Sequence, residues 1–237
     1  MDLGKSMERY AAEGVHETVI ECVTDVISTG DVLDVPTGQG ALAKDLEDLG
    51  FRVFPADLAR DNMVYRNGRC MQIDIDRSLP LRDEAFDYIV CVEGIEHVEN
   101  PFLLIREMAR VLKPGGHLII TTPNIMSIRS RLRFLLSSHL DYFKYFGPLP
   151  PEAKHRIAGF EHAHLTPVSY PQMRYMLEKY GFTVERVEAN QRVNKWPLAY
   201  RLLKMVIRHK TSRRYSDSFY LSDVLLEGEI LVFVAKK

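Results

Sequence analysis

The stretch VLDVPTGQGAL, residues 32–42, joins a short run of aliphatic residues to a helix-like run through a turn that contains two glycines. Glycines in such a turn let the backbone approach a ligand, and the first turn of the following helix offers free N–H groups. Asp34 ends the strand-like run, where its carboxylate can order the loop or meet an ammonium group. The stretch predicts the first strand–turn–helix unit of an α/β fold, with a ligand site at the carboxyl end of the strand.

Strand-like and helix-like segments alternate on both sides of this unit. Residues 15–27 place their valines on one helical face, and ALAKDLEDLG (41–50) is typical of a helix that Gly50 ends. Strand-like runs follow at 51–57, 71–74, 85–93 and 117–123, and a helix is predicted at 99–112, ended by Lys113-Pro114-Gly115-Gly116. This alternation predicts an α/β fold: a Rossmann-like doubly wound sheet, mostly parallel, with helices on both faces.

The alternation breaks after residue 123. A helix is expected near 127–137, then an aromatic and proline-rich loop at 142–152. A second helix is expected over 169–180, where Ser169 and Gln172 have the spacing of a capping box. The remaining predicted elements are a strand at 182–188, a basic helix within 196–214 and an antiparallel last strand at 229–237.

We interpret residues 1–237 as a single domain with additions. Residues 1–30 would form an N-terminal helical cap, and residues 124–163 and 191–225 would be insertions on the substrate side. A chain of 237 residues that is 46% hydrophobic is long enough to bury one full core, which is why no second domain is required.

Charge and cysteine usage narrow the class of protein. The formal net charge of −1 provides no strong field for nucleic acid, and the three cysteines have no metal-finger or disulfide spacing. The first ten residues do not have the pattern of a signal peptide, and no apolar run approaches the ~18 residues of a membrane span. We therefore expect a soluble, cytoplasmic protein.

Acidic residues end three successive predicted strands. Asp34 ends the first, Asp57 the second and Asp74 the third. Because ligands bind at the carboxyl ends of parallel strands, these carboxylates are candidates for one site, with Asp57 placed to accept hydrogen bonds from ribose hydroxyls and Asp74 from an adenine amino group. A single acid at such a position is more often a surface or turn residue, but three in succession favour a nucleoside-containing ligand.

Five segments resemble those of the class I S-adenosylmethionine (SAM) dependent methyltransferases. They are VLDVPTGQG (32–40), PADLA (55–59), DIDRSLPLRDEAFDYIV (74–90), EGIEHVENP (93–101) and ARVLKPGGHLIITTPN (109–124). The resemblance covers residues 10–190 and the last strand, and the last two segments are the most specific. It implies that the chain binds SAM and transfers its methyl group to an acceptor.

The resemblance also implies roles for single residues. Gly38 and Gly40 would pass close to the methionine part of SAM, Asp57 would hold the ribose, and Asp74 with the Ile75 backbone would hold the adenine. The family usually has glycine where Pro36 stands, so cofactor contacts of this loop would start at Thr37. The predicted cofactor-binding residues are Asp34, Thr37, Gly38, Gly40, Asp57, Leu58, Asp74, Ile75 and Glu93.

Two carboxylates and an imidazole follow the fourth predicted strand. If a helical turn begins there, Glu93, Glu96 and His97 lie on one face and could bind a divalent metal (Mg, Mn or Zn), with His162 or His164 as a further ligand. Ubiquinone-pathway O-methyltransferases and small-RNA 3′-end 2′-O-methyltransferases carry a similar metal-binding Glu-x-x-Glu-His. The alternative is that these residues cap a helix, contact the cofactor, or act as acid and base.

Both interpretations favour O-methylation. The methyl donor is already activated, so the protein has to align the nucleophile and remove its proton. A hydroxyl needs this help most, either from His97 or His164 as a general base or from a metal that lowers the hydroxyl pKa. The predicted catalytic residues are Glu96, His97 and His164.

The substrate side is less specific. Tyr142, Phe143, Tyr145 and Phe146 could stack on a sugar, an aromatic ring or a base, or simply pack their loop. The basic helix within 196–214 could touch an anionic membrane or a phosphorylated substrate, or be solvated on one side. A loose resemblance of residues 121–136 and 225–237 to bacterial methyltransferases favours a small-molecule, glycan or lipid-linked acceptor.

Three other functions stay open. An RNA 2′-O-methyltransferase is compatible with the Glu-His cluster, but phosphate-tracking surfaces are basic and this chain is nearly neutral. A catalytically silent SAM-binding regulator would explain Pro36, although not the intact cluster. A nicotinamide-dependent dehydrogenase shares the glycine turn alone.

Overall fold

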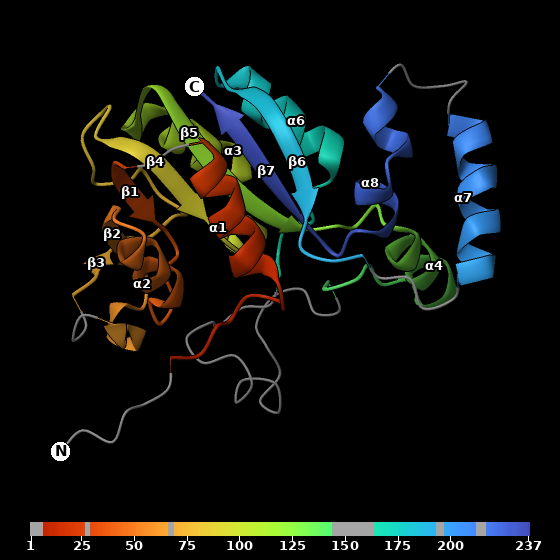
Figure 1. Cartoon of the computed structure of the whole chain (residues 1–237), viewed down its shortest axis with the longest axis horizontal. Coiled ribbons are helices and arrows are strands. Elements are labelled where there is room, and N and C mark those ends of the chain that lie inside the picture. Colours follow the sequence, from red (N-terminus) through yellow and green to blue (C-terminus); the bar gives the residue numbers. More distant parts are fainter. Residues whose placement is uncertain (1–6, 27–28, 66–68, 144–163, 193–196, 212–216) are drawn as a thin grey trace.

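The computed structural model describes residues 7–26, 29–65, 69–143, 164–192, 197–211 and 217–237. Seven strands form one sheet: β1 Asp31–Asp34, β2 Arg52–Asp57, β3 Met71–Gln72, β4 Phe86–Cys91, β5 Leu112–Pro123, β6 Thr183–Ala189 and β7 Ile230–Lys236. Their order is β3-β2-β1-β4-β5-β7-β6, and the sheet crosses the molecule in Figure 1.

All strand pairs up to β5 are parallel, whereas β7 lies antiparallel between β5 and β6. Strand order reverses beside β1, which is first in sequence but lies between β2 and β4. In open α/β sheets, this switch point at the carboxyl edge is where ligands bind. The topology therefore places the candidate site at the ends of β1, β2 and β4.

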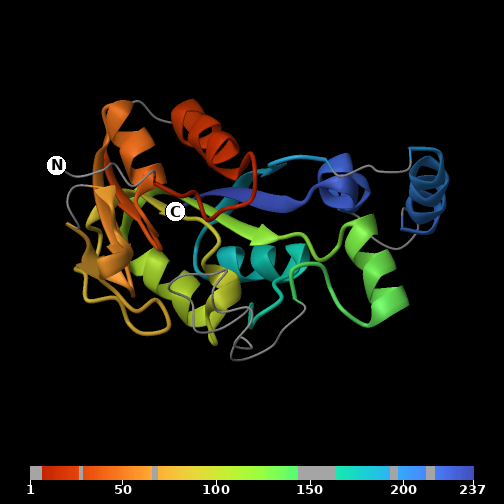
Figure 2. The ribbon, with the colours of Figure 1, turned by 90° about the horizontal axis from the view of Figure 1, so that it is seen from below.

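Helices cover both faces of the sheet. They are α1 Val15–Val26, α2 Ala41–Asp48, α3 Pro101–Val111, α4 Ile128–Ser137, α6 Tyr170–Lys179, α7 Pro197–Thr211 and α8 Asp223–Glu227. Short 3-10 turns are η1 Arg60–Asn62, η3 Ile95–His97 and η4 Ser218–Leu221. Figure 2 shows α1 and α2 on one side of the sheet and α3 and α6 on the other.

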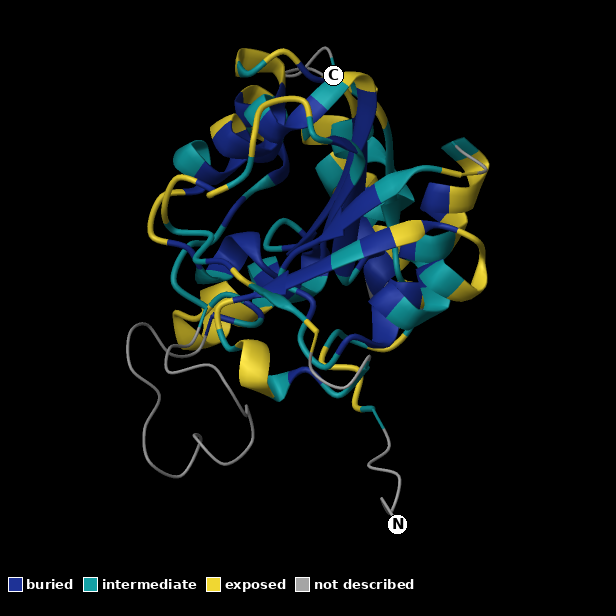
Figure 3. Ribbon diagram, turned by 90° about the vertical axis from the view of Figure 1, so that its left-hand side faces the viewer, coloured by how far each residue is buried: buried dark blue, intermediate teal, exposed yellow. Residues whose placement is uncertain are grey.

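Alternation along the strands builds two separate cores. Leu33 of β1 and Phe233 of β7 pack with residues of α3 and α6, whereas Val32 and Val232, one position away, pack with residues of α1 and α2. Successive side chains of a strand point to opposite faces, so a strand covered on both faces must be apolar throughout. Figure 3 shows the resulting buried centre.

The predicted fold class is therefore confirmed, including the antiparallel last strand. Several local predictions differ from the structure, two of them at the ends of helices. The segment Lys113 to Gly116 belongs to β5, which begins directly after α3. The capping box was wrong: Ser169 precedes α6, but its side chain makes no capping hydrogen bond, and Pro171, at the second helical position, has no N–H to donate.

The predicted insertions are described only in part. Residues 124–143 contain α4, residues 191–225 contain α7 and η4, and residues 144–163 lie outside the described part of the chain. The single-domain interpretation with its cap and insertions stays a prediction. None of the described helices combines the length and the apolar character needed to cross a membrane.

Asn124 ties the end of β5 to the connection between α8 and β7. Its buried side-chain amide donates hydrogen bonds to the carbonyls of Leu225 and Gly228, both at 2.9 Å, and its oxygen accepts one from the Met126 N–H. We expect Asn124→Ala to lower the free energy of unfolding by about 2 kcal/mol, because buried carbonyls lose their donors. Urea unfolding measures this change, and an unchanged midpoint would contradict it.

Candidate active site

A cavity lies at the carboxyl ends of β1, β2 and β4. Its walls come from the N-terminal segment, from the loop between β1 and α2, from the end of β2 and from the loop after β4. The lining residues are Glu8, Tyr10, Ala11, His16, Asp34, Pro36, Thr37, Gly38, Gln39, Ala41, Leu42, Asp57, Val92, Glu93, His97 and His164. The sequence-predicted residues Asp34, Thr37, Gly38, Asp57 and Glu93 thus meet around one space.

The loop between β1 and α2 has the backbone shape that its glycines predict. Gly38 has φ 57° and Gly40 φ 87°, in the left-handed region that disfavours a side chain. The peptide bond between Val35 and Pro36 is cis. Pro36 packs against Gly94, where an added Cβ would lie 2.6 Å from Pro36 Cδ, so Gly94 provides the room that this proline needs.

Asp34 orders the loop, one of the two roles expected of it. Its carboxylate accepts a hydrogen bond of 2.5 Å from Thr37 Oγ1. The residue is 1% exposed, and Asp34 Oδ1 has no partner among the described residues. Burial raises the pKa of Asp34 to about 7, against the opposing effect of the Thr37 hydrogen bond. A cationic donor in the cavity would satisfy the remaining oxygen.

Asp57 joins the ends of β1 and β2. Its carboxylate accepts hydrogen bonds from the N–H groups of Gly38 and Ala59, both at 2.9 Å. A carboxylate has about four lone-pair positions, so two stay available for a ligand. Leu58, the next residue, is 59% exposed and does not line the cavity.

The structure does not bring Asp74 and Ile75 to the cavity wall. The Asp74 carboxylate accepts a hydrogen bond from the Asp76 N–H and pairs with Arg77 at 3.0 Å, and Ile75 packs against the larger hydrophobic core. Gly40 caps α2 behind the loop and is not part of the wall either. Their predicted roles toward the cofactor stay predictions.

Sequence reasoning missed the N-terminal segment. Gln39 donates to the Tyr10 hydroxyl at 2.7 Å and accepts from the Glu8 N–H at 2.7 Å, which fixes this segment against the glycine loop. His16 of α1 adds a buried imidazole to the wall. Burial lowers the pKa of His16. No sequence pattern singles these residues out, since they reach the site through tertiary packing.

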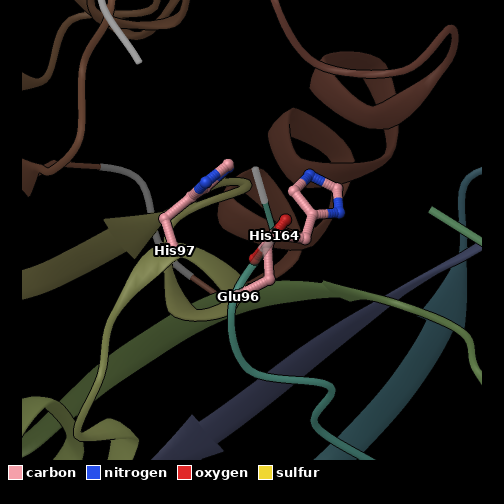
Figure 4. A group of neighbouring side chains, drawn as sticks. All are labelled: Glu96, His97 and His164. Carbon is pink, nitrogen blue, oxygen red and sulfur yellow. The ribbon is translucent and has the colours of Figure 1, made fainter. Parts of the chain in front are cut away.

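A carboxylate and two imidazoles meet at one side of the cavity. Glu96 and His97 belong to η3, and His164 lies in the segment before α6 (Figure 4). One donor atom from each lies within 4.8 Å of the others, a grouping able to hold a metal ion. Both Glu96 oxygens and His164 Nδ1 are buried without a hydrogen-bond partner in the described chain. His162, the other proposed ligand, lies outside the described residues.

Glu93 is not one of these three residues, but it lines the same cavity. Its backbone has φ 51°, so it does not continue into the turn of η3. Its N–H donates to Thr121 Oγ1 at 2.8 Å. Burial and the nearby Glu229 carboxylate raise the pKa of Glu93 to about 7. The sequence predicted one helical face with Glu93, Glu96 and His97. In the structure only Glu96 and His97 share the turn of η3, and His164 provides the third donor of the group.

Contacts from distant segments fix the cluster. The Glu96 carbonyl accepts hydrogen bonds from the N–H groups of Leu165 at 2.7 Å and Thr166 at 3.0 Å, which tie the segment carrying His164 to η3. The rings of His97 and His164 meet edge to face with centroids 4.7 Å apart, and Tyr142 stacks on His164 with centroids 6.3 Å apart.

Burial sets the protonation states of the cluster. It raises the pKa of Glu96 well above its usual range, and the nearby Glu93 carboxylate acts in the same direction. It lowers the pKa of His97 to about 3, with His164 contributing, and that of His164 to about 4. Both imidazoles are therefore neutral at physiological pH, the form in which histidine binds metals.

Known proteins match both sequence and fold. Residues 5–187 match a methyltransferase domain family. A ubiquinone biosynthesis O-methyltransferase from Thiobacillus denitrificans is 27% identical over 181 residues, which are 69% of this chain and 75% of that protein. A protein of the same name from Xanthomonas oryzae is 33% identical over 138 residues, which are 54% of this chain and 55% of that protein.

Solved structures share the fold at lower identity. A SAM-dependent methyltransferase from Archaeoglobus fulgidus superposes with a TM-score of 0.60 at 17% identity and covers 94% of this chain and 93% of its own. A phosphoethanolamine N-methyltransferase from Haemonchus contortus, solved with SAM, superposes with a TM-score of 0.53 at 18% identity. The match covers 93% of this chain and 52% of that chain. With the family match over most of the sequence and a cavity at the switch point of the sheet, the chain belongs to the methyltransferase domain family and is a class I SAM-dependent methyltransferase.

Proposed function

We propose that this methyltransferase transfers the methyl group of SAM to a hydroxyl oxygen of a small-molecule, glycan or lipid-linked acceptor. The observation that carries the proposal is the cluster of Glu96, His97 and His164 at one side of the cavity. A hydroxyl must lose its proton to attack the methyl group, and such a cluster serves that step. The names of the two relatives described above point to O-methylation as well.

The cavity suits SAM by charge and by its unfilled hydrogen bonds. SAM carries a sulfonium and an ammonium group, and the walls hold the carboxylates of Asp34, Asp57 and Glu93. The partnerless Asp34 Oδ1 fits an ammonium donor, and the spare lone pairs of Asp57 fit ribose hydroxyls. The positive φ of Gly38 brings the loop backbone to the cavity wall without a side chain.

Two neutral imidazoles and a carboxylate also fit a divalent metal (Mg, Mn or Zn). Glu96, His97 and His164 would supply three protein ligands and leave a position for the acceptor oxygen. A bound divalent ion would lower the pKa of the acceptor hydroxyl. The two Glu96 oxygens have no hydrogen-bond partner among the described residues, which supports a metal at this place. A buried carboxylate without a partner costs free energy, and a bound cation would offset that cost.

A metal-free version uses His97 or His164 as the general base. Their lowered pKa values, about 3 and about 4, make them weak bases, and a general base works best with a pKa near the working pH. We therefore prefer metal-assisted removal of the hydroxyl proton to a histidine general base. An RNA acceptor would use the same cluster, but the net charge of −1 gives it no support.

Transfer of labelled methyl from SAM to a panel of hydroxyl, amine and carbon acceptors tests the proposal. We expect label on oxygen, loss of activity after EDTA treatment and recovery with added Mg²⁺, Mn²⁺ or Zn²⁺. EDTA-resistant O-methylation would support the histidine base instead. Transfer to amines or carbon alone would contradict the assignment to hydroxyl acceptors, and failure with every acceptor would favour a SAM-binding regulator.

SAM affinity is expected to fall about tenfold between pH 8 and pH 6. The pKa of Asp34 in the free protein is raised to about 7, so lowering the pH through that value neutralises the carboxylate. A cationic ligand favours the ionised form, and binding therefore weakens as the pH falls. Glu93, also with a pKa raised to about 7, acts in the same direction.

Calorimetric titration at several pH values measures this dependence. Asp34→Asn should make the profile less steep, with the remaining dependence due to Glu93, whereas Asp61→Asn, which changes a carboxylate whose side chain is 99% exposed, should leave it unchanged. Equal affinity of the wild type at pH 6 and pH 8 would show that neither buried carboxylate faces a positive group of the ligand.

A further inference from the structure

Helices α4 and α7 lie together at one end of the molecule. Figures 1 and 2 both place them at the end away from α2 and β3. A small core of Ile128, Tyr200 and Leu226 joins them to α8, and Leu203 and Ile207 of α7 pack against it. These contacts determine which face of α7 points inward and which points to solvent.

The outward face of α7 is apolar. Its stripe consists of Leu198, Leu202, Met205 and Val206, whose i, i+4, i+7, i+8 spacing follows one side of the helix, and Leu202 is 66% exposed. The last turn of α4 adds Phe134, Leu135 and Leu136, the last 83% exposed. We call these seven residues the apolar stripe. Single exposed apolar residues are ordinary, but this many on two adjacent helices mark an interaction surface.

Basic side chains border the apolar stripe, and acidic ones are absent from both helices. Neither residues 128–137 nor residues 197–211 contain Asp or Glu. Helical spacing places Arg201 and Arg208 along one side of the stripe of α7 and Lys210 along the other. Arg208 pairs with Asp223, whereas Arg201 and Lys210 make no ion pair with any described residue. All three are exposed.

The surface lies beyond the edge of the sheet where the cavity is found. Because β5 and β6 are both antiparallel to β7, their carboxyl ends leave the sheet at the same edge. That edge also carries the carboxyl ends of β1, β2 and β4, and thus the cavity. α4 follows β5 along the chain and α7 follows β6, so both helices project from this edge.

We propose that α7 and the last turn of α4 dock onto the surface of an anionic phospholipid bilayer. The apolar stripe would enter the headgroup region while Arg201, Arg208 and Lys210 meet lipid phosphates, an arrangement typical of helices that lie in the membrane interface. RNA would use the cations but gain nothing from aliphatic side chains, and a second copy packed isologously would bring the cations of one α7 toward those of the other. The proposal does not depend on which acceptor is methylated.

Vesicle co-sedimentation of the full chain tests the docking. We expect binding to phosphatidylcholine vesicles with about a third phosphatidylglycerol, and at least fivefold weaker binding to phosphatidylcholine alone or at high salt. Leu202→Glu should weaken binding about tenfold or more, because it places a charge in the apolar stripe. Arg201→Glu should weaken it about fivefold or more.

Matched controls change the same residue types elsewhere. Leu49→Glu alters a leucine that is 47% exposed after α2, and Arg82→Glu alters an exposed arginine before β4; both should bind vesicles like the wild type. Circular dichroism of every variant checks that the fold is retained. The proposal is overturned by no binding, by equal binding to both vesicle types, or by equal losses in variant and control. Binding to an RNA oligonucleotide in place of vesicles, or a Leu202-dependent dimer that does not bind vesicles, would overturn it too.

Discussion

Replacing Glu96 with Gln is expected to lower the turnover of methyl transfer about 10²- to 10³-fold and to leave SAM affinity within about twofold. Glu96 does not line the cavity at the ends of β1 and β2, so its loss removes no contact to the cofactor. It provides the only carboxylate of the three-residue cluster with His97 and His164. The chain would therefore still bind SAM but would no longer help to remove the proton of the acceptor.

The substitution is suited to separate catalysis from folding. Burial holds the pKa of Glu96 well above its usual range, which favours the neutral carboxyl, and a glutamine of equal size resembles that form. Glu99→Gln, an exposed change in the same loop, is the matched control and should keep full turnover. His97→Asn should lower turnover to a similar extent. Full turnover in both Glu96→Gln and His97→Asn would show that the cluster takes no part in the reaction.

Asp57→Ala is expected to weaken SAM binding about 30-fold or more. A hydrogen bond to a charged group contributes about 1.5–3 kcal/mol, which corresponds to roughly 10- to 100-fold in affinity. The change also removes the acceptor for the Gly38 and Ala59 N–H groups, which loosens the loop that would cover the methionine part of SAM.

Calorimetry with SAM and its demethylated product measures the effect of Asp57→Ala, with Asp61→Ala as the exposed control. Both ligands share the ribose, so both should lose affinity to a similar extent. A change of less than twofold would mean that Asp57 organises the loop without touching the cofactor. The same titration on Asp74→Ala tests whether the adenine reaches the end of β3.

The parts of the fold that follow from local pattern could be predicted from the sequence. The central strands are apolar at consecutive positions, as in Val32 and Leu33, because helices cover both faces of the sheet. Element ends were less predictable. β3 is limited to Met71–Gln72, where it pairs with β2, while the predicted strand ran to residue 74. Ser169 precedes α6 as predicted, yet its side chain makes no capping hydrogen bond.

The candidate site was predictable where chain order determines it. Asp34 and Asp57 end adjacent parallel strands, so their approach follows from topology alone. The loop after β4 was not predictable by spacing, since Glu93 has a positive φ and does not belong to the turn that carries Glu96 and His97. Glu8, Tyr10 and His16 reach the cavity through packing of the N-terminal segment, which no local pattern encodes.

Calorimetric titration of the metal-free chain with SAM, then with Mg²⁺, Mn²⁺ or Zn²⁺, decides whether the cavity is a SAM site beside a metal-binding cluster. We expect SAM binding in the micromolar range and a further metal-dependent heat that is lost in Glu96→Gln. SAM binding without any metal-dependent heat would mean that His97 or His164 removes the proton without a metal. If SAM gives no heat, the cavity formed by Asp34, Gly38 and Asp57 is not a cofactor site, which would contradict the proposed SAM site.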